Sequence, residues 1–388
     1  MIFYGHASPE SHLAMDLFAH LSVIEDHRSH INRQHNLVDI MFLVMAAVVS
    51  GCEGWQEIED FGNDKLPWLR QFRPFASGIP TRHSIARIIK GVALKSLLHA
   101  LFTWVNSQRQ AAGQSIIAID GKTVRGAASR KADVPLHLVS AFDTGEGLVL
   151  CQQRANGKGG EIAAVRELLD ALQVKGAILT MDALHCQMET LKQISKRGGD
   201  FVVQVKSNQP TLQAAIREAF QPHWDTQGEQ LAQHMTSDKG HGRSETRTTF
   251  QMAANLPAEL ARDWPGVTSL IAVERDRTIA GKGTVDTHYY VSSLPVNAEL
   301  AARAVRQHWH IENQQHWVLD VTFREDVCRI GDQDAAEAFA LLRRIALNMA
   351  QHHPAKKSKR RKIRASCWSD DFRMEMFFGI RANESGSQ

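Results

Sequence analysis

The sequence has few cysteines, no long apolar run and almost no excess of one charge sign. Its five cysteines are scattered over 388 residues without CxxC spacing, which argues against a disulfide framework or a thiolate zinc site and favours a reducing compartment. The longest apolar run, residues 40–49, has about half the length that a membrane span needs. The chain does not open with a basic segment followed by an apolar one. We therefore expect a cytoplasmic protein without membrane association.

The charged residues are nearly balanced in number but unevenly distributed. Lys and Arg exceed Asp and Glu by 45 to 42, which is too small an excess to indicate a polyanionic partner on its own. Residues 356–364 nevertheless read KKSKRRKIR. Such a block is typical either of a phosphate-contacting segment or of a solvated tail, and both interpretations stay open. We expect residues 351–388 to form a basic C-terminal tail.

The first third of the chain is predicted to be helical. Residues 1–30 show no clear pattern and are interpreted as a leader. From Leu37 onwards, apolar residues recur at three- and four-residue steps, which is the period of a helix. Thr81 follows the turn-forming GIP at 78–80 and can cap a helix that begins after it. We predict a helical N-terminal domain over residues 31–112.

Residues 113–350 change to an alternation of strands and helices. Two short apolar strands, at 115–120 and 176–182, each end in an aspartate. The neighbouring segments are predicted as strands at 135–142, 147–153 and 200–205 and as helices at 161–172 and 186–195. This order indicates a mixed α/β sheet whose early strands are antiparallel and whose later strands are joined by helical crossovers.

The second half of this region begins with an insertion. Residues 207–286 include polar stretches and predicted strands at 243–251 and 267–275. A strand at 288–293 and a strongly helical segment at 297–320 follow. We interpret the insertion as β-rich, within an otherwise alternating α/β domain.

Three carboxylates are candidates for a common site. Asp120 and Asp182 each terminate an apolar strand, and Glu312 lies in the helical segment that follows the insertion. Strand ends of such sheets meet at one edge, where ligands bind. Carboxylate oxygens suit Mg²⁺ or Mn²⁺, and two such ions about 3.5–4 Å apart promote in-line phosphoryl displacement. A single aspartate at a strand end is more often a turn or cap residue, so the prediction depends on all three.

Three sequence blocks contain these carboxylates. They read AIDGKT at 118–123, TMDA at 180–183 and HWHIENQQHWVLD at 308–320. The blocks resemble those of DDE transposases of insertion sequences, in particular the branch that contains the H-repeat-associated proteins of rearrangement hot-spot elements. The resemblance covers about residues 25–350 in the same order, with further similar segments WQEIEDFG at 55–62, FVVQVKSNQ at 201–209, HGRSETR at 241–247 and FRED at 323–326.

The resemblance implies a fold, an activity and a set of partners. The fold would be α/β, with a ribonuclease H-like mixed-sheet catalytic core, a β-rich insertion and a preceding helical domain with a role in binding DNA ends. Asp120, Asp182 and Glu312 would be the catalytic residues and the ligands of two Mg²⁺ or Mn²⁺ ions. The implied reaction is DNA cleavage and strand transfer, with element ends and target DNA as partners and a homodimer in the DNA complex. A bacterial, nucleoid-associated location follows from the same resemblance.

Basic residues near these blocks are candidates for DNA contacts. The family places tyrosine, arginine and lysine around the glutamate, whereas Val305, His308 and Leu319 stand at those spacings here. We therefore assign DNA contacts to other side chains and to the histidine: Lys122, Arg125, Lys206, Arg243, Arg247, Arg306, His308, Arg324 and Arg329. Lys122 has a second interpretation, in which it pairs with an acid.

Two tryptophans flank the glutamate on the same helix. Trp309 and Trp317 are predicted to pack in the core, with stacking on DNA bases as the alternative. His308 and His316 are expected to orient Glu312 or to contact DNA.

Two other functions remain open. A transposase-derived protein that binds DNA without catalysis would keep the same blocks. His308, Glu312 and His316 recur every four residues and share one helix face, which would also suit a zinc hydrolase. Helical zinc pairs usually have histidines four residues apart, and this function would leave Asp120 and Asp182 unexplained.

Overall fold

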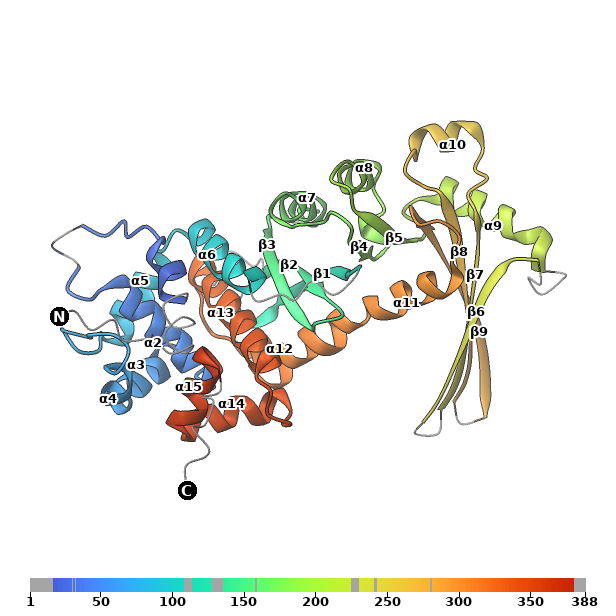
Figure 1. Ribbon diagram of the computed structural model, residues 1–388. Coiled ribbons are helices and arrows are strands. Elements are labelled where there is room, and N and C mark those ends of the chain that lie inside the picture. Colours follow the sequence, from blue (N-terminus) through green and yellow to red (C-terminus); the bar gives the residue numbers. More distant parts are fainter. Residues whose placement is uncertain are drawn as a thin grey trace, which may run out of the picture.

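Helices from both ends of the chain form a lobe beside a long sheet (Figure 1). The computed structural model describes residues 17–379, except 30, 32, 108–113, 128–134, 158, 225–229, 241–242 and 280. The large mixed sheet with helices confirms the α/β class that the order of strands and helices predicted.

The N-terminal part of the lobe is helical. Its elements are α2 (Leu37–Val49), α3 (Trp55–Asp64), α4 (Leu66–Leu69), α5 (Arg82–Lys90) and α6 (Leu94–Ser107). Asn36 caps α2, which is apolar around nearly its whole circumference and is almost entirely buried. Thr81 caps α5 as predicted, because its side chain accepts a hydrogen bond from the N–H of Ser84. Leu17 and Leu21, from the expected leader, are fully buried in the same core.

The hydropathy of these helices bears on membrane insertion. In the part of the chain that the structure describes, no single helix is long and apolar enough to cross a bilayer. The pair α5 and α6 reaches that length and hydropathy only together and is bent by 88°.

The C-terminal helices complete the lobe. They are α13 (Gln333–His352), α14 (Lys359–Trp368) and α15 (Asp370–Phe378). Arg373 is fully buried, with its guanidinium 5.1 Å from the ring centre of Phe61 and 4.6 Å from that of Trp68. Lys362, in the basic block, donates hydrogen bonds to two backbone carbonyls at 2.8 and 2.5 Å. Residues 359–378 are therefore packed helices and not the basic tail that local charge suggested. Lys362 is buried and hydrogen-bonded, whereas Arg360, Arg361 and Arg364 remain exposed on the helix surface.

A nine-stranded sheet forms the rest of the molecule, in the order β3-β2-β1-β4-β5-β9-β8-β7-β6. The strands are β1 (Ile116–Val124), β2 (Leu136–Asp143), β3 (Leu148–Ala155), β4 (Ile178–Met181), β5 (Asp200–Val205), β6 (Ala232–Gly240), β7 (Arg243–Ala253), β8 (Ser269–Ile279) and β9 (Lys282–Ser292). β1, β4 and β5 are parallel to one another. β2 is antiparallel to β1, and β9 is antiparallel to β5.

Helices cover the two faces of the parallel strands (Figure 1). One face carries α7 (Glu161–Ala171) and α8 (Met188–Lys196), and the other carries α11 (Ala298–His308), which continues through a π-helical turn into α12 (Trp317–Val321). Ile116, Ile178 and Val202 pack in one cluster with Ala301 and Ala304 of α11. Because side chains alternate across a strand, every second residue of these strands faces α11.

The expected insertion extends the same sheet. It contributes α9 (Pro210–Trp224), β6, β7, α10 (Ala258–Asp263), β8 and the start of β9, and its long strands project beyond the helices (Figure 1). β9 joins it to the core strands, with Val205 of β5 opposite Tyr289. The strands predicted at 243–251 and 267–275 correspond to β7 and β8.

Candidate active site

Asp120 and Asp182 lie at matching positions of neighbouring parallel strands. The register of β1 and β4 pairs Ala118 with Thr180, two residues before each aspartate, and Asp182 continues in extended conformation (φ −73°, ψ 177°). In-register residues of parallel strands about 4.8 Å apart share a face. That face is the α11 side, because Thr180 Oγ1 lies 3.1 Å from Nδ1 of His308. The strands therefore present both carboxylates beneath the helix that carries the third.

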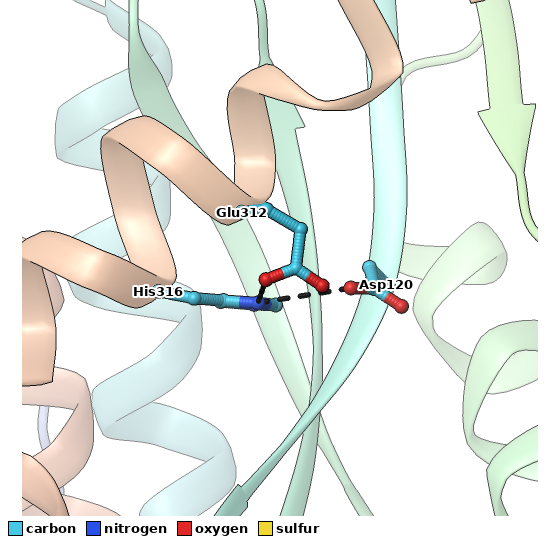
Figure 2. Close-up of side chains that lie close together, drawn as sticks. All are labelled: Asp120, Glu312 and His316. Atoms are coloured by element: carbon cyan, nitrogen blue, oxygen red, sulfur yellow. Dashed lines mark hydrogen bonds and ion pairs between the residues drawn. The ribbon is translucent and has the colours of Figure 1, made fainter. Parts of the chain in front are cut away.

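Glu312 approaches Asp120 and Asp182 from a π-helical turn, Ile311–His316 (η4). In this turn the hydrogen bonds span five residues where an α-helix spans four: the N–H of Trp317 donates to the carbonyl of Glu312. Such turns are rare inside α-helices and often lie at functional sites. Figure 2 shows Glu312 and His316 extending from this turn toward Asp120 on β1.

Asp120, Glu312 and His316 form a close cluster. One potential ligand atom of each lies within 4.8 Å of the other two. His316 Nδ1 is 3.4 Å from Oε2 of Glu312 and 3.7 Å from Oδ2 of Asp120. Asp182 is outside this cluster as the described side chains stand, although its charge contributes to the pKa of Asp120. The structure thus brings two of the three predicted carboxylates together and leaves the third beside them.

The two clustered carboxyl groups share one proton. Burial raises the pKa of Asp120 to about 8, and the negative charge of Glu312 adds to this effect. The hydrogen bond from His316 lowers the pKa of Glu312 to about 2, despite partial burial. Near neutral pH the proton therefore resides on Asp120. A cation held between the two groups could take its place.

The residues beside Glu312 on the helix differ in environment. Burial lowers the pKa of His308 to about 4, so its imidazole is neutral and packs against Thr180. Among the described residues, the group whose potential ligand atoms lie within 4.8 Å of one another includes Glu312 and His316 but not His308, so the helix-borne zinc set is not assembled there. Trp309 and Trp317 are 50% and 59% exposed, so the prediction that they pack in the core is wrong. Their indole rings are accessible for stacking on bases.

A second polar group lies behind the strand ends, on the α7 side. The Nε2 atoms of His137 and His185 lie 2.8 and 3.1 Å from the two carboxylate oxygens of Glu161. His185 Nε2 is also 3.8 Å from Oδ1 of Asp182. Burial alone would raise the pKa of Glu161, but the two histidines outweigh it and lower the pKa to about 2. A Cβ at Gly121 would lie 2.5 Å from Glu161 Oε1 and 2.6 Å from His137 Nε2, so a larger residue there would displace these two side chains from their contact.

Local sequence patterns do not predict this group, because Glu161 stands in the sequence only as the first residue of a predicted helix. The available signal was His185, which follows Asp182 by three residues and therefore sits in the turn after the strand.

Lys122 follows Asp120 on the same face of β1 but pairs with acids. Its buried ammonium is 2.7 Å from Asp320 and 3.0 Å from Asp326. Lys122 was predicted either to contact DNA or to pair with an acid, and in the structure it pairs with acids. The side chain of Arg125, predicted to contact DNA, is 82% exposed, and its Nε lies 3.7 Å from Asp326.

The other predicted DNA contacts are dispersed. Arg247 is largely buried between Glu245 and Asp238, and the exposed Arg306 reaches the same Asp238 at 3.7 Å. Lys206 is exposed just after β5, and Arg243 begins β7. Arg324 and Arg329 are exposed and line a separate cleft near α13.

Comparison with known proteins gives a consistent result. Residues 111–349 match the family described as Transposase DDE domain, and residues 18–105 match the family described as DDE_Tnp_1-associated. The chain is 36% identical to the "H repeat-associated putative transposase YhhI" of Escherichia coli (strain K12) over 373 residues, 94% of this chain and 98% of that protein. It is 35% identical to the "Putative protein YbfL" of the same strain, with the same coverage.

A shorter relative matches more closely. The "Inactive transposase YbfQ" of that strain is 44% identical over 73 residues, which are 19% of this chain and 87% of that protein. The first family match alone spans more than half of the sequence. The chain therefore belongs to the DDE transposase family and is similar to its H-repeat-associated members.

Proposed function

We propose that the chain catalyses metal-dependent DNA cleavage and strand transfer of an insertion sequence. The observation that carries the proposal is the meeting of Asp120 and Glu312, from segments far apart in the chain, beside the in-register Asp182. The strand order β3-β2-β1-β4-β5 with an antiparallel β2 supports a ribonuclease H-like core.

The donor set fits divalent metal ions. Asp120, Asp182 and Glu312 offer only carboxylate oxygens, which Mg²⁺ and Mn²⁺ prefer. Burial, and after it the negative charge of Glu312, raise the pKa of Asp120 to about 8 and keep the group protonated near neutral pH. A divalent ion would compensate the charges of both ionised carboxylates. When bound, a pair of such ions would activate the attacking hydroxyl and stabilise negative charge on the phosphoryl oxygens.

The surrounding residues hold these carboxylates in place. His316 orients Glu312, and the group of Glu161 and His185 supports Asp182 from behind. Fixed positions matter because a displacement of about 1 Å at the reacting centre can cost about a hundredfold in rate.

The partners follow from the family. We infer that element ends and target DNA are the substrates, that a homodimer joins two ends in the complex, and that the protein acts at bacterial DNA in the cytoplasm. The helices over residues 37–107 would bind the DNA ends, and the exposed Trp309 and Trp317 would stack on bases near the cleavage site.

The test uses purified protein and a supercoiled plasmid that carries the coding segment with its native flanking DNA. With Mg²⁺ or Mn²⁺ we expect nicking and joined products from the wild type and none from Asp120→Asn or Asp182→Asn. Glu189→Gln, an exposed acid on α8, is the matched control and should retain activity. Undiminished cleavage by either aspartate variant would refute the proposal. DNA binding without cleavage by the wild type would indicate a transposase-derived binding protein, and stoichiometric zinc in elemental analysis would indicate a zinc hydrolase.

A further inference from the structure

A charged cleft lies between the N-terminal helices and the segment that follows the glutamate-bearing helix. It has a volume of about 830 Å³ and is bounded by α3, α5, the loop around the short helix η5 (Glu325–Val327) and the start of α13. Its charged lining consists of Arg87, Lys90, Arg324, Arg329 and Arg343 together with Glu53, Glu57 and Asp332. Cations therefore exceed acids in this cleft.

The acids do not neutralise all of these cations. Lys90 pairs with Asp332 at 2.6 Å, and Arg324 pairs with Glu53 at 3.5 Å. Three arginines of the lining remain: Arg87, Arg329 and Arg343. The first two are exposed at the rim and make no ion pair with the described residues.

Arg343 is the unusual member of this set. Its side chain is 1% exposed, and neither Nη1 nor Nη2 has a hydrogen-bond partner within the described ranges of the chain. Its guanidinium carbon lies 4.5 Å from the ring centre of Phe339. This stacking holds one face of the guanidinium in place, and the Nη1 and Nη2 donors stay without acceptors among the described residues. A buried charge without an acceptor is strongly unfavourable. The adjacent Arg344 shows the usual solution, because it bonds to buried Glu325 at 2.8 Å.

We propose that this cleft binds a phosphate group of the DNA, with Arg343 as its buried anchor and Arg87 and Arg329 at the rim. The two Nη donors of a guanidinium match two oxygens of a phosphate group. The inference rests on the proposed function, since DNA is the polyanion that the chain would act on. The cleft also adjoins the catalytic strand, because Asp326, the neighbour in sequence of the lining residue Val327, pairs with Lys122, two residues after Asp120.

The first experiment measures DNA affinity without metal, so that catalysis does not enter. A fluorescently labelled duplex of arbitrary sequence is titrated with protein in EDTA over a series of salt concentrations. Arg343→Met should weaken binding about tenfold or more and reduce the slope of log affinity against log salt by about 0.9. Arg262→Met, an exposed arginine on α10 outside the cleft, should change neither quantity.

A second variant and a second probe complete the test. The exposed pair Arg87→Gln and Arg329→Gln cannot disturb the core and should reduce the salt slope by up to about 1.8. Inorganic phosphate should raise the melting temperature of the wild type but not of Arg343→Met. In phosphate-free buffer Arg343→Met should melt no lower than the wild type, because it removes an unpaired buried charge.

The outcomes separate this inference from the proposed function. Wild-type affinity and salt slope in both cleft variants would overturn it. Stabilisation by inorganic phosphate that requires Arg343, with unchanged DNA binding, would assign the cleft to free phosphate and overturn the DNA assignment. DNA binding that depends on Arg343 in a protein that never cleaves DNA would refute only the proposed catalysis.

Discussion

Metal binding to the carboxylate cluster should be strongly pH-dependent, because a proton must leave first. Asp120 is 17% exposed, and its pKa is raised to about 8 by burial and by the charge of Glu312. Glu312, with a pKa of about 2, is already ionised at neutral pH. A carboxyl group binds a metal ion only when ionised. Binding therefore displaces about one proton, and that proton comes from Asp120.

The size of the effect follows from the pKa of Asp120. Below that value the apparent dissociation constant rises about tenfold for each pH unit, which is about 1.4 kcal/mol. Between about pH 8, where the group is half ionised, and about pH 6, affinity should fall about fiftyfold. Asp120→Asn should bind more weakly and lose this dependence. Glu312→Gln should shift the dependence to lower pH, since it removes the neighbouring charge but not the burial.

Isothermal titration with Mn²⁺ in two buffers of different ionisation enthalpy measures the metal affinity and the number of protons released. Near pH 7 the buffer-dependent part of the heat should correspond to release of about one proton per protein, and the release should fade above about pH 9. Glu189→Gln again serves as the control and should follow the wild type. Stoichiometric Mn²⁺ binding with the same affinity at pH 6 and pH 8, or without proton release, would refute the shared-proton assignment.

The raised pKa of Asp120 also makes the free energy of unfolding depend on pH in a defined direction. The folded state retains a proton on Asp120 that the unfolded chain loses at about pH 4. This group's contribution to the unfolding free energy of the metal-free protein is therefore fully present below about pH 4 and is lost as the pH rises through about 8. Asp120→Asn should abolish this loss in pH-dependent urea unfolding.

Three substitutions test the surroundings of the site. Gly121→Ala places a methyl group 2.5 Å from Glu161 Oε1, and we expect a loss of about 1–3 kcal/mol in urea unfolding together with loss of DNA cleavage; a fully active variant would contradict the close packing. Glu161→Gln should lower kcat about 10–100-fold with unchanged DNA affinity, whereas Glu167→Gln, on the exposed side of the same helix, should alter neither. Glu325→Gln breaks the fully buried pair with Arg344 and should cost about 3–5 kcal/mol in chemical denaturation; a cost below about 1 kcal/mol would show that the pair is dispensable.

The strands around the site could be predicted because their signals are local. Apolar runs, turn glycines and helical periodicity place β1 to β5 and their connecting helices within a few residues of the observed bounds. The main difference is that β1 continues past Asp120 to Val124. Its polar end gives no strand signal of its own and depends on pairing with β2, where Asp120 lies opposite Ser140 and Val124 opposite Leu136.

Partners distant in sequence explain what could not be predicted. The block at 356–364 is typical of a phosphate-contacting segment or a solvated tail, yet Lys359 donates a hydrogen bond to the carbonyl of Gln314, 45 residues earlier. Glu161 gives no catalytic signal by itself, and it gains significance only where folding brings His137 and His185 to its two oxygens.

The π-helical turn explains how one helix can serve both the sheet and the site. In an unbroken α-helix, residues eight positions apart such as His308 and His316 differ by about 80° around the axis. The wider turn at Ile311–His316 rotates the chain less per residue and offsets this drift. His308 can therefore anchor the helix against Thr180, and His316, eight residues later, can still face Asp120. Regular four-residue spacing in the sequence predicts the shared face, and the altered hydrogen bonding of the turn keeps His316 on the side of the helix that meets Asp120.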